Sequence, residues 1–124
     1  MRALLDTSVL IGAERPGDLE GAISAASIAE LHFGVLAAGD EDERARRAQR
    51  LGVVEATFDP LPIDVAVARE WGRLAAAVSS RGGQPRRRAV DLVIAATANV
   101  QGVPLLTRDK DLSLIEDLVE IQIP

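Results

Sequence analysis

Short continuous runs of hydrophobic residues alternate along this chain with segments in which hydrophobic residues recur every three or four positions. Residues 1–5 are apolar except for Arg2, which predicts a buried strand at the N-terminus. Further strands are predicted at residues 22–25, 59–63, 103–107 and 119–123. The last of these alternates with a period of two, as in a strand with one exposed face. Residues 59–63 contain two prolines, which remove ladder donors and limit this segment to an edge.

The segments between these runs have helical spacing. Helices are predicted to begin at Thr7, Ser27, Asp40, Asp64 and Val90, with a short helical segment at residues 112–117. Ser27 and Glu30 have the spacing of a capping box, in which a hydroxyl and a carboxylate close the first turn. Residues 90–98 are apolar all round except for Asp91, which predicts a helix buried against a sheet.

Residues 40–50 place acids first and arginines later, as in a solvent-exposed helix. Three ion pairs with i, i+4 spacing are predicted: Asp40–Arg44, Asp42–Arg46 and Glu43–Arg47. Because these arginines have acidic neighbours, contacts with phosphates are the less favoured interpretation.

Strands and helices alternate from end to end, so the sequence predicts an α/β fold with a central parallel sheet between two layers of helices. Right-handed crossovers would connect the strands. A length of 124 residues is that of one domain, and we expect residues 1–124 to form it.

The composition of the chain excludes some kinds of catalysis and binding. The chain has no cysteine, which excludes thiol catalysis and disulfides and fits a reducing cytoplasm. No segment approaches 18 uninterrupted apolar residues, so we expect a soluble, unexported protein with no membrane partner. The formal net charge of −5 argues against binding nucleic acid through bulk positive charge, but it does not exclude a metal-dependent nuclease.

Four acids, Asp6, Glu30, Asp91 and Asp109, share one position: each follows a strand or loop and begins a helix or turn. Each could simply be a helix cap. In a parallel sheet, however, the carboxyl ends of all strands meet at one edge, where such acids converge. Two carboxylates about 5 Å apart repel by roughly 3 kcal/mol at an effective dielectric of 20, so the cluster would need a cation. Oxygen ligands of this kind suit Mg²⁺, with Mn²⁺ as a substitute.

Such a site could activate water for attack on a phosphodiester, which is the chemistry of a nuclease. Hydroxyl groups that could orient ligands or water belong to Thr7, Ser8 and Thr107. Asp111 is a possible fifth acid, more simply explained as a supporting residue or a cap. Contacts with phosphates are open to Arg86, Arg87, Arg88 and Arg108, although solvation explains these loop arginines equally well.

Four motifs together resemble the PIN-domain ribonucleases, and specifically the VapC toxins of bacterial toxin–antitoxin pairs. They are LLDTSVLI at residues 4–11, SIAELHFGV at 27–35, AVDLVIAATA at 89–98 and LLTRDKDL at 105–112. The motifs lie in the order of the family and cover the chain from end to end. Motif by motif, the resemblance implies metal-binding acids at Asp6, Glu30, Asp91 and Asp109, with Asp111 accessory.

The resemblance also implies a Mg²⁺-dependent endoribonuclease, a homodimer, and inhibition by a VapB-type antitoxin inserted near the site. Leu112 stands where the family often has Phe, which affects a core contact rather than the chemistry. Because aromatic residues make up only 2% of the chain, we expect RNA to be recognised by shape, as a tRNA or rRNA hairpin would offer.

Other functions are less well supported. A haloacid dehalogenase-type phosphotransferase needs a second Asp where Ser8 stands, and a response-regulator receiver needs an acidic neighbour that Asp6 lacks. A serine hydrolase is disfavoured because His32, the only histidine, lies two residues after Glu30 within a helix. The main alternative is a non-catalytic, metal-binding interaction module of the same fold.

Overall fold

A computed structural model describes all residues from Met1 to Pro124. Three short parallel strands form the sheet in the order β1 (Leu4–Leu5), β2 (Leu105–Leu106) and β3 (Ile121–Gln122). Two single parallel bridges, Leu4 with Ala22 and Ser24 with Leu61, extend the pairing beyond β1. All five predicted strand segments therefore take part in parallel pairing, and β1 lies inside the sheet.

The ladders are shorter than the apolar runs predicted. Pro104 has no N–H to donate, although its carbonyl accepts from Leu4 N at 2.9 Å. On β1, the chain leaves the ladder at Asp6 and enters a helix at Thr7. The pairing is thus limited by a proline on one strand and a sharp turn on the other.

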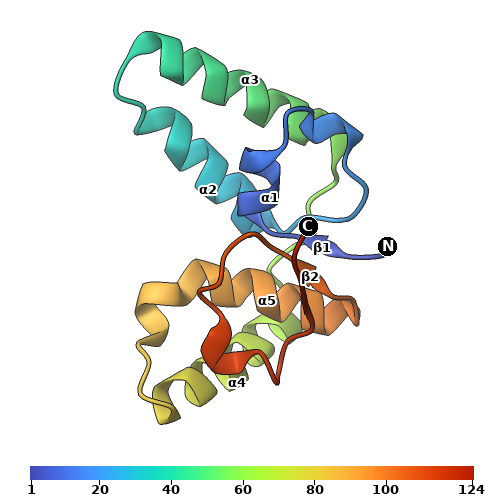
Figure 1. The fold of residues 1–124 in the computed structure, drawn as a ribbon, viewed down its shortest axis with the longest axis vertical. Coiled ribbons are helices and arrows are strands. Elements are labelled where there is room, and N and C mark those ends of the chain that lie inside the picture. Colours follow the sequence, from blue (N-terminus) through green and yellow to red (C-terminus); the bar gives the residue numbers. More distant parts are fainter.

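Five α-helices surround the sheet: α1 (Thr7–Gly12), α2 (Ala25–Leu36), α3 (Glu41–Thr57), α4 (Val65–Ser80) and α5 (Ala89–Gln101). Short 3₁₀ turns lie at Pro16–Asp18, Pro85–Arg88 and Ser113–Ile115. Helices α1, α2 and α3 lie on one side of the strands, and α4 and α5 lie on the other (Figure 1). This arrangement confirms the three-layer α/β/α prediction. None of the helices combines the length and apolar character that crossing a membrane requires.

Successive residues of a strand are buried in two separate hydrophobic cores, one on each face of the sheet. Leu4 and Leu105 are buried among residues of α4 and α5. Leu5 is buried instead among residues of α1, α2 and α3. This alternation follows from the two-residue period of a strand, and it explains why residues 1–5 are continuously apolar.

The start of α2 differs from the prediction. Its N-cap is Ser24, whose Oγ accepts a hydrogen bond from Ala26 N at 3.0 Å. Ser27 lies inside the first turn and is buried, so the predicted capping box of Ser27 and Glu30 is wrong. The physical reason is the sheet: Ala25 N donates to Leu61 O at 2.9 Å, which ends the extended segment earlier than expected.

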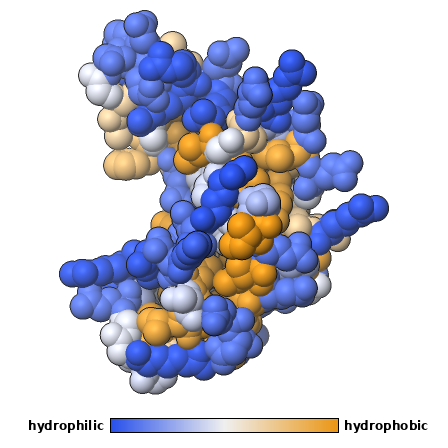
Figure 2. Space-filling view, in the orientation of Figure 1, coloured by the Kyte–Doolittle hydropathy of each residue, from blue (hydrophilic) through white to orange (hydrophobic).

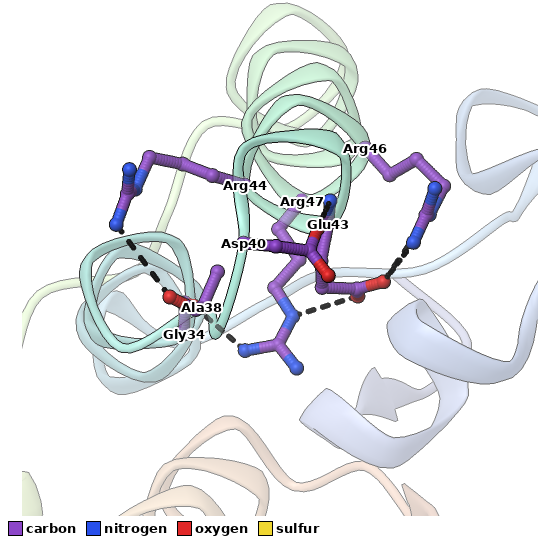
Figure 3. A network of polar contacts seen from close by, with 7 residues as sticks. All are labelled: Gly34, Ala38, Asp40, Glu43, Arg44, Arg46 and Arg47. Carbon is purple, nitrogen blue, oxygen red and sulfur yellow. Dashed lines mark hydrogen bonds and ion pairs between the residues drawn. The ribbon is translucent and has the colours of Figure 1, made fainter.

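Helix α3 is charged and exposed, as predicted, but its ion pairs differ (Figure 3). Only Glu43–Arg47 of the three predicted pairs is present, at 2.9 Å. The predicted pairs Asp40–Arg44 and Asp42–Arg46 do not form. Asp40 caps the helix instead by accepting from Glu43 N at 2.8 Å, and Arg46 pairs with Glu43.

Candidate active site

A pocket of about 360 Å³ lies where β1 ends, between the two layers of helices. It is lined by Asp6, Thr7, Ser8, Ile11, Gly12, Glu30, Asp91 and Asp109. The structure therefore brings together the four acids singled out in the sequence, from the turn between β1 and α1, from α2, from α5 and from the loop after β2. The molecular surface is hollowed between the α2–α3 arm and the part built by α4 and α5 (Figure 2).

Asp6 is fixed in the pocket by both its backbone and its side chain. Its backbone N–H donates to Leu106 O at 2.9 Å, which continues the pairing of β1 with β2. Its carboxylate accepts hydrogen bonds from Ser8 N (3.3 Å), Ser8 Oγ (2.6 Å) and Thr107 Oγ1 (3.0 Å). Asp6 is also the N-cap of α1, and only 5% of its surface is exposed. The cap and the pocket acid are therefore the same residue.

The hydroxyl groups beside Asp6 also hold the loop that carries Asp109. Thr107 Oγ1 accepts from Asp109 N at 3.0 Å, and Ser8 Oγ accepts from Arg108 N at 3.0 Å. Thr107 does not itself line the pocket, but it connects two acids that are far apart in the sequence. Ser8 and Thr107 thus hold the Asp6 carboxylate and the loop of Asp109 in place, and their role in orienting ligands or water stays a prediction.

Glu30 is positioned by a chain of hydroxyl groups between α1 and α2. Thr7 Oγ1 donates to Glu30 Oε1 at 2.6 Å and lies 2.9 Å from Ser27 Oγ. Because the only hydroxyl proton of Thr7 is used toward Glu30, Ser27 is the donor in the second bond. Sequence reasoning missed this role of Ser27 because the capping-box spacing offered a sufficient local explanation.

The acids shift one another's pKa values. Burial, followed by the charges of Asp6, Glu30 and Asp109, raises the pKa of Asp91 to about 6. The pKa of Glu30 is raised by burial and by the charges of Asp6 and Asp109, against the lowering effect of Thr7. The pKa of Asp109 is also raised, first by burial and then by Asp6 and Asp111. These directions are those expected of carboxylates that share a pocket without a cation.

Asp111 lies outside the pocket of acids. It forms an ion pair with Arg88, with 2.7 Å between Asp111 Oδ2 and Arg88 Nη1. Arg88 also lowers the pKa values of Asp91 and Asp109, although burial and the neighbouring acids outweigh it. This ion pair could not be foreseen, because 23 positions separate two residues whose types are common in loops.

Two other pocket residues, Ile11 and Gly12, were not predicted. A Cβ atom at Gly12 would lie 2.7 Å from Arg108 Nε, so a larger residue there would displace the exposed Arg108 side chain. His32 is exposed on α2 and does not line the pocket, which leaves no support for a serine hydrolase.

The donor set fits a hard divalent cation. Every candidate ligand is a carboxylate or hydroxyl oxygen, and neither histidine nor cysteine is present in the pocket. In this structure no three acids lie close enough together to coordinate one metal ion. Binding of an ion would therefore require side chains to converge against their mutual repulsion, which together with the larger effect of burial raises the pKa values of Asp91 and Glu30.

Comparisons with known proteins agree with this architecture. The model of the PIN domain family matches residues 3–118. Ribonuclease VapC5 of Mycobacterium tuberculosis (strain ATCC 25618 / H37Rv) is 36% identical over 127 residues, which cover 97% of this chain and 92% of that protein. Ribonuclease VapC4 of the same strain is 36% identical over 129 residues, covering 98% and 97% of the two chains.

Solved structures show the same fold. The VapBC-5 toxin–antitoxin complex from Mycobacterium tuberculosis contains a chain with a TM-score of 0.81 and 35% identity, covering 98% of this chain and 96% of that one. FitAcB from Neisseria gonorrhoeae gives a TM-score of 0.75 at 26% identity, with 97% and 96% covered. The chain belongs to the PIN-domain family, and within it to the VapC group.

Proposed function

We propose that this protein is a metal-dependent endoribonuclease that acts as the toxin of a toxin–antitoxin pair and is neutralised by a VapB-type antitoxin. The observation that carries the proposal is the pocket in which Asp6, Glu30, Asp91 and Asp109 meet without a basic side chain among the lining residues. The relatives named Ribonuclease VapC5 and VapC4, which align over nearly the whole chain, support the same activity.

Each residue has a distinct part in this mechanism. Asp6, Glu30, Asp91 and Asp109 would hold Mg²⁺, or Mn²⁺ in its place. When bound, the ion supplies Lewis-acid polarisation of the phosphodiester and lowers the pKa of water. Ser8 and Thr107 hold the Asp6 carboxylate in one orientation, and Thr7 does the same for Glu30. Restricting these carboxylates reduces the reorganisation needed when the site fills.

The first test is cleavage of RNA by the purified protein with Mg²⁺, compared with EDTA and with Asp6→Asn and Asp91→Asn. We expect cleavage by the wild type with Mg²⁺ alone. Cleavage that survives EDTA and both substitutions would contradict the metal mechanism. A wild type that binds the metal but cleaves no RNA would favour the non-catalytic interaction module.

The RNA substrate is proposed to be structured, such as a tRNA or rRNA hairpin. The chain has a net charge of −5 and few aromatic residues, so recognition would rest on the position of a few phosphates rather than on a stacking platform. Sequencing the 5′ ends of fragments that accumulate on expression tests this. Cleavage spread evenly over unstructured RNA would contradict it.

An exposed apolar surface beside the acids supports the antitoxin proposal. Ile11 lines the pocket and is half exposed, and Phe33, one turn beyond Glu30 on α2, is 71% exposed. Large apolar side chains beside a polar pocket favour a protein partner that covers it. The test is inhibition of cleavage by the cognate antitoxin, which should weaken in Phe33→Asp. Equal inhibition of both proteins would place the antitoxin elsewhere.

A second apolar surface supports the proposed homodimer. A groove of about 470 Å³ between α2, α4 and α5 is lined only by hydrophobic residues, among them Ile63, Trp71 and Val90. Uncharged surfaces of this kind are typical of interfaces between copies of one chain. Light scattering should give the mass of a dimer for the wild type and of a monomer for Val90→Asp. A monomeric wild type would contradict the proposal.

A further inference from the structure

We propose that a second, cationic pocket beside the acids binds one nucleotide of the RNA strand that flanks the cleaved bond. This inference rests on the proposed nuclease function and adds a substrate subsite to it. The pocket has a volume of about 520 Å³ and lies between the Pro85–Arg88 turn, α5 and the segment after β2. Its basic residues are Arg87, Arg88 and Lys110, and its floor includes Leu92, Leu112 and Ile115.

The two pockets share a wall made of consecutive residues. Asp91 lines the pocket of acids, and the next residue, Leu92, lines the cationic pocket. In the same way Asp109 faces the acids, whereas Lys110 and Asp111 face the cationic pocket. Consecutive Cα atoms are only about 3.8 Å apart, so the two pockets are neighbours.

The charges of this pocket are available to a ligand. Arg88 is paired with Asp111 at 2.7 Å, but neither Arg87 nor Lys110 forms an ion pair. Lys110 is the only lysine in the sequence. Although the chain has a net charge of −5, two unpaired cations thus lie next to the pocket of acids. Such cations attract phosphate groups that the acids themselves would repel.

The floor of the pocket suits a base rather than a bare anion. Leu114, which is 43% exposed, gives the pocket an accessible apolar face, and the buried residues Leu92 and Ile115 pack beneath it. Gln84 and Ser113 add polar groups to the lining. Proteins recognise splayed-out bases of single-stranded RNA by stacking them on aromatic side chains or arginine guanidinium planes and by hydrogen bonds to the base edges. Here Arg87 offers a guanidinium plane, and Gln84 and Ser113 can bond base edges. The volume also lies within the usual range for ligand pockets, about 300–1,000 Å³.

The same pocket explains why the three adjacent arginines differ. Arg87 and Arg88 line it, whereas Arg86 is exposed and does not. Asp111 holds Arg88 at the wall between the pockets, which makes Asp111 a positioning residue for a cation. Among the acids near the site, it is the one committed to a basic partner.

The test uses a fluorescent, single-stranded RNA 12-mer of mixed sequence, with EDTA present so that binding is measured without cleavage. Arg87→Ala and Lys110→Ala should each weaken binding about tenfold, as expected for loss of a hydrogen bond to a charged group. Each should also reduce the slope of log K against log salt by about 0.7, the value for one phosphate contact on a single strand.

Arg69→Ala is the matched control, because Arg69 is an exposed, unpaired arginine on α4 that lines neither pocket. It removes the same charge and should leave affinity and slope unchanged. Melting curves confirm that all three variants fold. Variants of Arg87 and Lys110 that bind the 12-mer as Arg69→Ala does would overturn the subsite.

Two further measurements complete the test. The first distinguishes an RNA subsite from a site for free nucleotides, and the second distinguishes failure of the subsite proposal from failure of the proposed nuclease function. Mixed nucleoside 5′-monophosphates should bind more weakly than the 12-mer; tighter binding would indicate a site for free nucleotides and overturn the proposal. Cleavage with Mg²⁺ is measured in parallel. A wild type that cleaves while the variants bind normally overturns the subsite alone. A wild type that binds through Arg87 and Lys110 but never cleaves supports the pocket and overturns the nuclease function.

Discussion

The acids of α3 and the acids of the pocket show two opposite ways of accommodating negative charge. On α3, hydrogen bonds from Arg46 and Arg47 hold the pKa of Glu43 below its usual value (Figure 3). In the pocket, burial and neighbouring carboxylates raise the pKa of Asp91 to about 6. The same residue class is thus neutralised by arginines in one region and left without them in the other.

The pocket lacks a basic side chain that would stabilise the charged form of its acids. The arginine nearest to Asp91 in sequence, Arg88, pairs with Asp111 instead and lines the neighbouring pocket. The carboxylate of Asp91 receives no hydrogen bond that would favour its charged form. A cation from solution best accounts for a charge that the protein leaves unsatisfied, whereas the acids of α3 need none. Substitutions in the two regions should therefore have different effects.

The largest expected effect is on catalysis. Asp91→Asn should reduce Mg²⁺-dependent RNA cleavage about a thousandfold, because loss of a ligand removes several kcal/mol of transition-state stabilisation. Glu43→Gln removes one carboxylate from α3 and should leave the rate unchanged. Initial rates at saturating Mg²⁺ measure both. Equal rates for the two variants would remove the functional distinction between the two groups of acids.

Metal binding should stabilise the folded protein through the pocket alone. At a Mg²⁺ concentration one hundred times the Kd, linkage predicts a gain of about 2.7 kcal/mol. Thermal melting with and without Mg²⁺ measures this gain at pH 7.5. Asp91→Asn should lose most of it, whereas Glu43→Gln should keep it. A gain of the same size in Asp91→Asn would mean that the ion binds elsewhere.

Without metal, removing a pocket acid should have the opposite effect. Asp91→Asn should stabilise the metal-free protein by about 1–2 kcal/mol, after allowance for solvent screening of a half-buried group. Asp6→Asn is the contrasting variant, because its carboxylate accepts three hydrogen bonds and caps α1, so it should destabilise. Chemical denaturation in EDTA distinguishes them. Similar losses in both would indicate that the two acids serve the stability of the fold rather than a metal site.

The pH dependence follows from the raised pKa of Asp91. Between pH 4 and the folded-state value of about 6, the folded protein binds more protons than the unfolded chain. Stability of the metal-free protein should therefore fall as the pH rises through this window. Affinity for Mg²⁺ should rise over the same range, because the ligands must be deprotonated. Denaturation series at several pH values check the first trend, which Asp91→Asn should flatten.

Features of the fold and the site could be predicted where they depend on residues close together in the sequence, and less well where they depend on contacts between distant residues. The strand after which Asp6 stands, the buried helix that carries Asp91 and the cap at Asp64 follow from local patterns, and the structure has all three. The meeting of Asp6 with Asp109 in one pocket was also predicted, because parallel strands end at one edge.

Side-chain partners were less predictable where two local interactions competed. Ser24 and Ser27 are both good caps, and only the backbone bond from Ala25 to Leu61, on a distant segment, selects the first. The link from Ser27 through Thr7 to Glu30 depends on how α1 packs on α2. Such contacts are set by tertiary packing, which has no signal in the local sequence.

The smallest expected effect is the change in stability caused by a substitution on α3. Glu43→Gln weakens the pairs with Arg46 and Arg47, but these side chains remain in solvent, where ion pairs contribute little. Arg47 would keep its hydrogen bond to Gly34 O at 2.8 Å, which joins α3 to α2. We therefore expect a small loss of melting temperature that disappears at 1 M NaCl, since salt screens the lost pairs. A gain in stability, as expected for Asp91→Asn, would show that the α3 acids also repel one another and would erase the contrast with the pocket.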